Sequence, residues 1–403
     1  MKLLLLENLD EKSLLSEIDR IGADRRSFPF FFRKREILLL SAKGLDVRAA
    51  NALKQEMLSR GGDIIVHKRT IDCGVKETDA LLMATQGQFS RLLEKLGSMP
   101  YWGLQEFREA LARALRNASR KAWNIRLPRG RSLKLNDTTK IMGIVNLTED
   151  SFYEGSRKPD VRDAVSRALS FFGEGADIVD IGGESTRPGA VEIAPSQEAS
   201  RIVPVISEIR KSNPDCIISV DTRKSSVARK AVEAGADIVN DVSGLRYDPD
   251  MAKTVAELGV PLVLMHSRKT PEKMQDSPTY GDVVFEVCEE MDQSMRIAEE
   301  AGIGREAIIL DPGLGFAKET DHNLSLMKHL CAFRTMGRPL LVGHSRKSTI
   351  GRVLSLQSPA DRLEGTLAIT AICAWQGISV VRVHDVRENY RAVRMIRAIK
   401  DAK

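Results

Sequence analysis

Three polar side chains stand where apolar runs end, and their types suit recognition of a planar heterocycle. Asp221, Asn240 and Asp311 each close such a run. A carboxylate accepts hydrogen bonds from ring N–H groups, whereas an amide both donates and accepts, which suits an amino-pyrimidinone edge. A pocket of this kind rejects analogues that leave its own groups unpaired. The alternative is that each residue caps the helix that follows it, as Asp221 could do before Lys224.

Basic side chains gather late in the chain in a pattern that suits an anion. Residues 343–348 read GHSRKS and include Lys347, and Arg382 and His384 are two apart, so they point the same way on a strand. Asn146 would be their neighbour in a closed barrel and completes a predicted anion pocket. Lys347 adds a charge beside the backbone N–H groups of a helix start. The alternative is that these cations pair with acids on the surface.

Two glycine-flanked segments are predicted to be mobile loops that close over a substrate. The first, residues 148–155, contains Phe152, and the second, residues 182–189, contains Arg187. Arg187 can hold a carboxylate through two parallel hydrogen bonds. The alternative is that both segments are ordinary turns between a strand and a helix. Two interpretations of His266 stay open, namely that it belongs to the site or that it is a buried structural histidine.

The elements that must position these side chains are eight short apolar runs, each followed by an amphipathic stretch. Continuous rather than alternating apolar residues predict strands that are buried on both faces. Eight such units over about 266 residues match a (β/α)8 barrel, although an open doubly wound sheet shares the same alternation. The predicted strands are Ile141–Leu147, Ile178–Ile181, Ile217–Val220, Ile238–Val242, Pro261–Met265, Ile308–Leu310, Pro339–Val342 and Val380–Val383.

The polar clusters that follow these runs point to a single site. In a closed barrel the carboxyl ends of all strands meet at one face, where the active sites of TIM barrels lie. The fold also commonly holds phosphate groups after strands seven and eight, where GHSRKS and Arg382 occur. The predicted fold class is therefore α/β, a (β/α)8 TIM barrel with one site at its carboxyl face.

The first 135 residues break this alternation and are interpreted as a small basic α/β module of unknown role. A linker at Pro128–Asp137 is expected to join it to the barrel, which occupies residues 136–403. No catalytic motif occurs in the module. Its predicted strands are Glu36–Leu40 and Ile64–His67, and its predicted helices are Val47–Arg60, Gln88–Leu96 and Gly103–Trp123.

The net charge of +6 is unevenly distributed along the 403 residues. Residues 1–137 carry 26 Lys and Arg against 17 Asp and Glu, and eight basic residues without an acid lie between Arg113 and Lys134. Such a cluster can bind nucleic acid. The favoured interpretation is a solvated helix end and linker, because no nucleic-acid-binding motif accompanies the charge.

Other features of the composition exclude several classes of protein. No apolar run approaches the roughly 18–20 residues that a membrane span requires, and four leucines before Glu7 are too few for a secretory signal. The five cysteines lie far apart without metal-ligand spacing, which argues against a disulfide scaffold and a zinc site. A cytoplasmic location is expected.

Seven of these segments together resemble dihydropteroate synthase, the folate-pathway enzyme. They are NLTEDSF, DIGGESTRPG, SVDTRKSSVARKA, IVNDVSG, LDPGLGFAKETDHNL, GHSRKS and VVRVHDV, in the order of the family. The resemblance implies condensation of (7,8-dihydropterin-6-yl)methyl diphosphate with 4-aminobenzoate to give 7,8-dihydropteroate and diphosphate, with Mg2+ as cofactor. It also implies that the pterin C–O bond breaks before the aniline nitrogen attacks.

The resemblance assigns roles to individual residues of this sequence. Asn146 corresponds to the contact with metal and diphosphate, and Arg382 with His384 to the diphosphate pocket. The pterin-binding groups correspond to Asp221, Asn240, Asp311 and Lys347. The residues of the two mobile loops are Asp150, Phe152, Thr186 and Arg187, and those near the aminobenzoate are Pro188 and Ser348. The expected catalytic residues are Asp150, Phe152, Arg187 and Lys347.

Three features depart from the usual family pattern, and two other functions stay open. Glu149 stands where the first loop normally has proline, Ser267 and Lys269 replace other residues after the fifth strand, and the minimal enzyme lacks the N-terminal module. One alternative is a methyltransferase that moves a methyl group from a methylated tetrahydropterin to a corrinoid, without a diphosphate pocket. The other is a non-catalytic pterin-binding paralogue. Many relatives are dimers, so a homodimer with small-molecule substrates and no membrane partner is expected.

Overall fold

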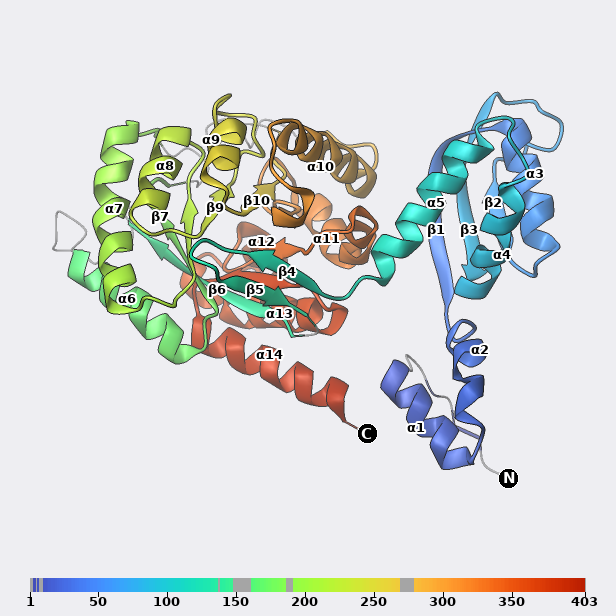
Figure 1. Cartoon of the computed structure of the whole chain (residues 1–403), viewed down its shortest axis with the longest axis horizontal. Coiled ribbons are helices and arrows are strands. Elements are labelled where there is room, and N and C mark those ends of the chain that lie inside the picture. Colours follow the sequence, from blue (N-terminus) through green and yellow to red (C-terminus); the bar gives the residue numbers. More distant parts are fainter. Residues whose placement is uncertain are drawn as a thin grey trace. The chain divides into compact units, whose positions relative to one another are not determined.

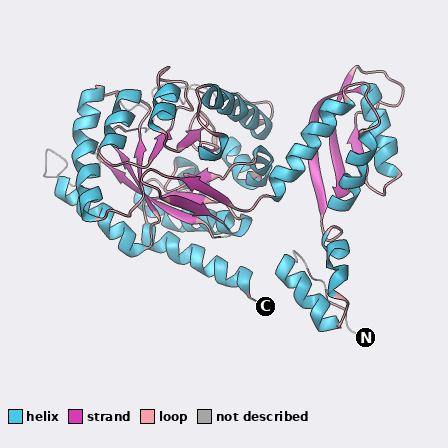
Figure 2. Ribbon diagram, viewed as in Figure 1, coloured by secondary structure: helices cyan, strands magenta, loops and turns pink. Residues whose placement is uncertain are grey.

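The computed structural model describes residues 3–4, 6, 10–136, 138–147, 161–185, 191–268 and 279–402. The chain divides into two compact units, Met1–Arg116 and Asn117–Ala402. Figure 1 colours the chain along its sequence and labels most of the helices and strands, and Figure 2 colours them by type. Within the described residues, no helix has both the length and the apolar character needed to cross a membrane.

The first unit is a three-stranded antiparallel sheet with the order β1-β3-β2, covered on one face by helices. Its strands are β1 (Ile37–Asp46), β2 (Asp63–Val66) and β3 (Glu77–Thr85). Its helices are α1 (Glu11–Ile21), α2 (Phe28–Phe32), α3 (Val47–Leu58), α4 (Gln86–Leu96) and α5 (Leu104–Ser119), the last of which runs past the division. Buried Leu82 alternates with more exposed neighbours along β3 and shares one buried core with Leu53 of α3 and Leu92 of α4, as expected for a sheet with one covered face.

The sequence-based expectations for this unit hold in part. Both predicted strands occur, but β3 was not predicted, although its alternating pattern is typical of a half-buried strand. The helix predicted over Gly103–Trp123 ends at Ser119, and Trp123 begins a strand instead. This error arose because apolar residues spaced at helical intervals continue past the end of α5.

The second unit contains eight parallel strands in a closed ring. They are β6 (Lys140–Asn146), β7 (Ile178–Gly182), β8 (Ile218–Asp221), β9 (Ile238–Asp241), β10 (Leu262–Met265), β11 (Ile308–Asp311), β12 (Leu341–Val342) and β13 (Val380–Val383). Neighbours follow the chain order from β6 to β11, and β13 lies between β6 and β12. A parallel bridge between Leu310 and Leu340 joins β11 to the residue before β12 and closes the ring. The predicted (β/α)8 barrel is therefore confirmed.

Helices alternate with these strands and surround them (Figure 2). They are α6 (Val161–Glu174), α7 (Pro195–Ser212), α8 (Ser225–Glu233), α9 (Met251–Leu258), α10 (Val283–Glu300), α11 (Thr320–Lys328), α12 (Ser348–Leu354), α13 (Leu363–Gln376) and α14 (Val386–Asp401). Outward-facing strand residues such as Val220 and inward-facing helix residues such as Ile206 and Val227 share one buried core. This core fixes the strand ends that carry the site.

A β-hairpin covers the amino end of the barrel, where a linker was expected at Pro128–Asp137. Strands β4 (Trp123–Arg126) and β5 (Ser132–Leu135) pair antiparallel. Their buried Ile125 and Leu133 pack with residues at the starts of the barrel strands. The expected boundary after residue 135 thus differs from the observed division at 116, because the apolar side chains of the hairpin belong to the barrel.

A buried carboxylate fastens this hairpin. Asp237, which precedes β9, is fully buried. It accepts hydrogen bonds from Arg129 and Arg131 of the hairpin and from Arg210 of α7, the last at 2.6 Å. Two of the eight basic residues in the cluster between Arg113 and Lys134 are thus paired inside the fold, although that cluster was interpreted as a solvated helix end and linker.

Candidate functional site

Arg382 joins two carboxylates from other strands at the carboxyl end of the barrel. Its Nε donates to Asp180 Oδ2 and its Nη2 to Asp221 Oδ2, both at 2.6 Å. Asn240 Nδ2 donates to the same oxygen of Asp180 at 3.0 Å. These four side chains come from β13, β7, β8 and β9, and they meet because parallel strands end at one face. Arg382, expected in an anion pocket, is already paired in this structure.

Burial dominates the electrostatics of these carboxyl groups. It raises the pKa of Asp221 to about 7, although the positive charge of Arg382 opposes the shift. Burial also raises the pKa of Asp311, against a hydrogen bond of 2.7 Å from the Gly313 N–H. The Oδ1 atom of Asp180 is buried without a hydrogen-bond partner among the described residues. Groups in this state gain free energy from a ligand that supplies N–H donors.

Lys347 adds a cation to the same end of the barrel. It precedes α12, and its Nζ lies 4.3 Å from the centroid of the Phe316 ring, a cation–π distance. Burial lowers the pKa of Lys347 to about 8, and the negative charge of Asp311 opposes the shift. A Cβ on Gly343 would lie 3.7 Å from Asp311 Oδ2 and 3.9 Å from Arg382 Cβ, so these side chains are close neighbours.

His384 is held in an uncharged state. Its Nδ1 lies 3.0 Å from Ser345 Oγ, which also accepts from the backbone N–H of His384. Burial lowers the pKa of His384 to about 4, and the charges of Arg382 and Arg346 add to the effect. At neutral pH the imidazole therefore supplies hydrogen bonds rather than charge. Arg346 forms two hydrogen bonds to Asp385. For Arg346, therefore, the alternative that these cations pair with acidic residues applies.

Asn146 ends β6 at the same face, where it was expected to contact a metal ion. A Cβ on Gly182 would approach its Oδ1 to 3.4 Å and the Cβ of Asp221 to 3.5 Å, which places Asn146 beside Asp221. Within the described part of the chain, no three His, Cys, Asp or Glu side chains are arranged to hold a metal ion. Mg2+ commonly takes one or two oxygen ligands from protein and the rest from water and phosphates. The amide oxygen of Asn146 fits that mode of binding.

Several predicted site residues lie outside the described residues. They are Asp150, Phe152, Thr186, Arg187 and Pro188. Glu149 and Lys269, which depart from the usual family pattern, also lie outside the described residues. Ser348 is the exposed first residue of α12. The predicted residues that the structure brings to the carboxyl end of the barrel are Asn146, Asp221, Asn240, Asp311, Lys347, Arg382 and His384.

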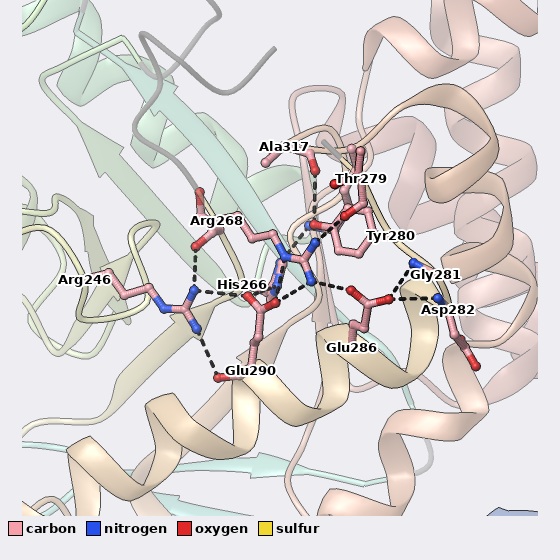
Figure 3. Close-up of polar contacts among 12 residues, drawn as sticks. Arg246, His266, Arg268, Thr279, Tyr280, Gly281, Asp282, Glu286, Glu290 and Ala317 are labelled. Carbon is pink, nitrogen blue, oxygen red and sulfur yellow. Dashed lines mark hydrogen bonds and ion pairs between the residues drawn. The ribbon is translucent and has the colours of Figure 1, made fainter. Parts of the chain in front are cut away.

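Sequence reasoning missed Asp180 and Lys318. An acid inside the apolar run of β7 was the available signal for Asp180. Lys318 is 3% exposed and lies 2.9 Å from His266 Nδ1, but a buried lysine in a loop looks like any surface lysine in a sequence. His266, which was left open, is buried between Lys318 and Glu290, and Figure 3 shows its polar surroundings.

Comparison with known proteins agrees with this geometry. The family model described as "Pterin binding enzyme" matches residues 142–384. The chain belongs to this family. Dihydropteroate synthase of Escherichia coli is 43% identical over 274 residues, which cover 68% of this chain and 96% of that protein. The structure of Xanthomonas albilineans dihydropteroate synthase with 4-aminobenzoic acid has a TM-score of 0.65 and 40% identity, and covers 70% of this chain and all of that one.

A second type of relative matches more of this chain. A probable bifunctional folylpolyglutamate synthase/dihydropteroate synthase of Haloferax volcanii is 42% identical over 361 residues. The match covers 88% of this chain but only 42% of the archaeal protein, so this chain spans less than half of that relative. Because 361 residues exceed the length of the barrel unit, the similarity extends into the first unit.

Proposed function

We propose that this chain acts as a dihydropteroate synthase. It joins the methylene carbon of (7,8-dihydropterin-6-yl)methyl diphosphate to the amino nitrogen of 4-aminobenzoate, while the C–O bond to diphosphate breaks. The products are 7,8-dihydropteroate, diphosphate and the proton that the amine gives up. The observation that carries the proposal is the cluster of Asp180, Asp221, Asn240 and Arg382 at the carboxyl end of a barrel of the pterin-binding enzymes.

Asp221, Asn240, Asp311 and Lys347 hold the pterin in this proposal. The carboxyl groups accept hydrogen bonds from the ring N–H and amino groups, and the ammonium donates to a ring acceptor. Because Asn240 Nδ2 is bonded to Asp180, its Oδ1 is the atom that accepts from the ring. A pterin fills the unmet hydrogen-bonding capacity of the buried carboxyl groups, whereas an analogue without the amino group leaves one unpaired.

Arg382, His384 and Asn146 contact the diphosphate. A guanidinium has five N–H donors, and two of those on Arg382 are used by carboxylates, so others can reach an anion. His384 donates one neutral N–H from its imidazole ring. Asn146 would hold Mg2+, which when bound neutralises the charge that develops on the departing diphosphate.

The residues around the second substrate are proposed from the resemblance. Arg187 would bind the carboxylate of 4-aminobenzoate, and Ser348 would lie near it. Phe152 and Pro188 would pack against the aromatic ring. Thr186 and Asp150 complete the two loops. Arg187 suits a carboxylate because its planar guanidinium forms two parallel hydrogen bonds.

Bond breakage precedes bond formation in the proposed mechanism. Departure of diphosphate leaves positive charge on the pterin, and the carboxyl groups of Asp221 and Asp311 lower the free energy of that charge. The amine of 4-aminobenzoate is a weak base but an adequate nucleophile toward a cation. No strong general base is therefore required.

Release of diphosphate tests the proposal directly. The purified chain is mixed with the dihydropterin diphosphate and Mg2+, with and without 4-aminobenzoate, and both diphosphate and dihydropteroate are quantified. Release that depends on 4-aminobenzoate and matches dihydropteroate in amount is the expected result. Tight pterin binding without release would instead indicate a non-catalytic pterin-binding protein.

The proposal also includes a homodimer in the cytoplasm, as the resemblance implies. Light scattering of the purified chain gives its mass in solution. A mass near 44.7 kDa rather than twice that value would contradict the homodimer.

A further inference from the structure

A buried lysine that takes no part in the proposed reaction lies beneath the pterin pocket. Lys318 belongs to the loop between β11 and α11, and it is 3% exposed. Its Nζ donates to Gly313 O at 3.0 Å, to Phe316 O at 2.9 Å and to His266 Nδ1 at 2.9 Å. The Nζ thus makes three hydrogen bonds, two of which hold the backbone of its own loop, and burial lowers the pKa of Lys318 to about 7 against the charge of Asp311.

This loop follows an unusual backbone path. Ala317 has a φ of 48°, in the left-handed region that residues with a side chain rarely adopt, and it is fully buried. Gly313 has a φ of 66°, and a Cβ there would collide with the carbonyl oxygen of His266. A conformation of this kind persists only where the surroundings over-determine it. The hydrogen bonds of Lys318 and that of Tyr280 Oη to Ala317 O, at 3.1 Å, supply such restraint.

The same loop forms the surface on which Lys347 rests. The ring of Phe316 lies under the Lys347 ammonium at 4.3 Å. A Cβ on Gly315 would come within 3.1 Å of Lys347 Cδ, so the stem of the lysine lies against bare backbone. The position of Lys347 thus depends on where residues 315 and 316 are held.

A chain of polar contacts continues from Lys318 through His266 to helix α10. Figure 3 shows its part from His266 onward, with Arg268, Glu286 and Glu290. Burial, followed by the charge of Lys318, lowers the pKa of His266 to about 3, so the imidazole is neutral. Its Nδ1 accepts from Lys318, and its Nε2–H therefore donates to Glu290 Oε2 at 3.1 Å. Glu290 also accepts from Arg268 Nε at 2.7 Å, and Glu286 accepts from Arg268 Nη2 at 2.6 Å.

We propose that Lys318 is a positioning residue for the pterin pocket. Anchored through His266 to α10, it fixes the backbone of Gly313 and Phe316 and thereby sets Lys347 against the bound pterin. This inference rests on the proposed function, because it takes Lys347 as a pterin contact. Lys318 itself does not touch the substrate.

The first test replaces the ammonium by an apolar group of similar length. Lys318→Met should raise KM for the dihydropterin diphosphate about tenfold while kcat falls less than about threefold, because the pocket shifts but the leaving-group contacts stay. The affinity for pteroic acid, measured by titration without turnover, should fall by a similar factor. Lys328→Met, at an exposed lysine on α11, is the matched control and should change neither quantity.

A double-mutant cycle asks whether Lys318 acts through Lys347. In the Lys347→Ala background, Lys318→Met should weaken pteroic acid binding by less than about twofold, because the group that it positions is gone. Effects that multiply independently would show that Lys318 acts by another route and would overturn the inference.

A pair of substitutions at His266 keeps the test decisive if Lys318→Met does not fold. His266→Asn places an amide oxygen near the position of Nδ1 and should keep most of the pteroic acid affinity, whereas His266→Leu removes the acceptor and should lower it. Equal affinity in the two variants would contradict the inference. Diphosphate release by the unsubstituted chain in the same assay tests the proposed function separately. An active chain with an unaffected Lys318→Met variant would remove only the positioning role.

Discussion

Two clusters of buried carboxylate and guanidinium groups lie at opposite ends of the barrel strands, and they differ in how completely they are satisfied. At the amino end, both oxygens of Asp237 accept hydrogen bonds, from Arg129, Arg131, Arg210 and the backbone N–H of Ile218. At the carboxyl end, Asp180 leaves its buried Oδ1 without a partner among the described residues. Asp221 beside it carries a raised pKa.

This difference in hydrogen bonding indicates that the cluster of Asp237 has a structural role and that the cluster of Asp180 is suited to bind a ligand. A carboxylate whose acceptors are all used has nothing left to offer a ligand, so the cluster of Asp237 holds the hairpin against the barrel. A buried carboxylate with a spare oxygen pays a desolvation cost that a ligand can relieve. Both clusters pair a fully buried carboxylate with arginine, and the two carboxylates differ in whether both of their oxygens accept hydrogen bonds.

The largest expected effect is on the free energy of unfolding, through the cluster of Asp237 with Arg129, Arg131 and Arg210, which we call the saturated cluster because both oxygens of Asp237 accept hydrogen bonds. Asp237→Asn leaves three arginines without their shared counter-charge and should lower the free energy of unfolding by about 3 kcal/mol. Pteroic acid affinity of the folded protein should stay unchanged. Urea unfolding and ligand titration of the same variant measure the two quantities. An unfolding free energy equal to that of the unsubstituted chain would refute the fastening role.

The reverse pattern is expected at the carboxyl end. Asp221→Asn should weaken binding of the dihydropterin diphosphate about 30-fold, or about 2 kcal/mol, because a charge-assisted acceptor is lost. The free energy of unfolding should change by less than about 1 kcal/mol, since Arg382 keeps its bond to Asp180. Asp292→Asn, at an exposed residue of α10, is the control. Unaltered binding would remove Asp221 from the pocket.

The charge of Lys347 should make pterin binding depend on pH. A lysine is charged below its pKa and neutral above it, and burial lowers the pKa of Lys347 to about 8. The affinity for the dihydropterin diphosphate should therefore fall as the pH rises above 8, by up to about tenfold at pH 9. Lys347→Arg keeps its charge and should abolish this decline. A wild-type affinity that stays level to pH 9 would contradict the proposed contact.

The smallest effect is expected for one arm of the saturated cluster. The side chain of Arg129 is 44% exposed, against 19% for Arg131 and 14% for Arg210. Arg129→Ala should therefore lower the free energy of unfolding by only about 0.5 kcal/mol, because two better buried arginines remain. A loss as large as that of Asp237→Asn would mean that the three arginines act as one unit.

The barrel could be predicted from the sequence because its strands are buried on both faces. Such strands are continuous apolar runs, and all eight predicted runs occur, with bounds close to those expected. The hairpin at Trp123–Leu135 was interpreted as a helix end and linker because its residues are basic and include Pro128 and Gly130. Only the fold shows that Asp237, about a hundred residues later, neutralises two of those arginines.

The site could be predicted only as far as strand ends reveal it. Asp221, Asn240 and Asp311 were found because they end apolar runs, and Arg382 was found because it lies two residues before His384 on the last predicted strand. The pairing of Arg382 with two carboxylates could not be predicted, because Asp221 precedes Arg382 by 161 positions and Asp180 precedes it by 202 positions. Lys318 escaped notice because the burial of a loop side chain is a property of the tertiary structure.

Neighbouring strands of the barrel are not joined by equal numbers of backbone pairings around the ring. Strand β12 has two residues, and its junction with β11 rests on the single bridge from Leu310 to Leu340. Backbone amides along this seam should exchange with deuterium sooner than those of β7 or β8, because local opening needs few bonds to break. Asp311 ends β11 and Lys347 follows β12, so a pterin bound by both, as proposed, would bridge the two sides of the seam. The proposed ligand would thus stabilise a part of the ring that few backbone hydrogen bonds hold together.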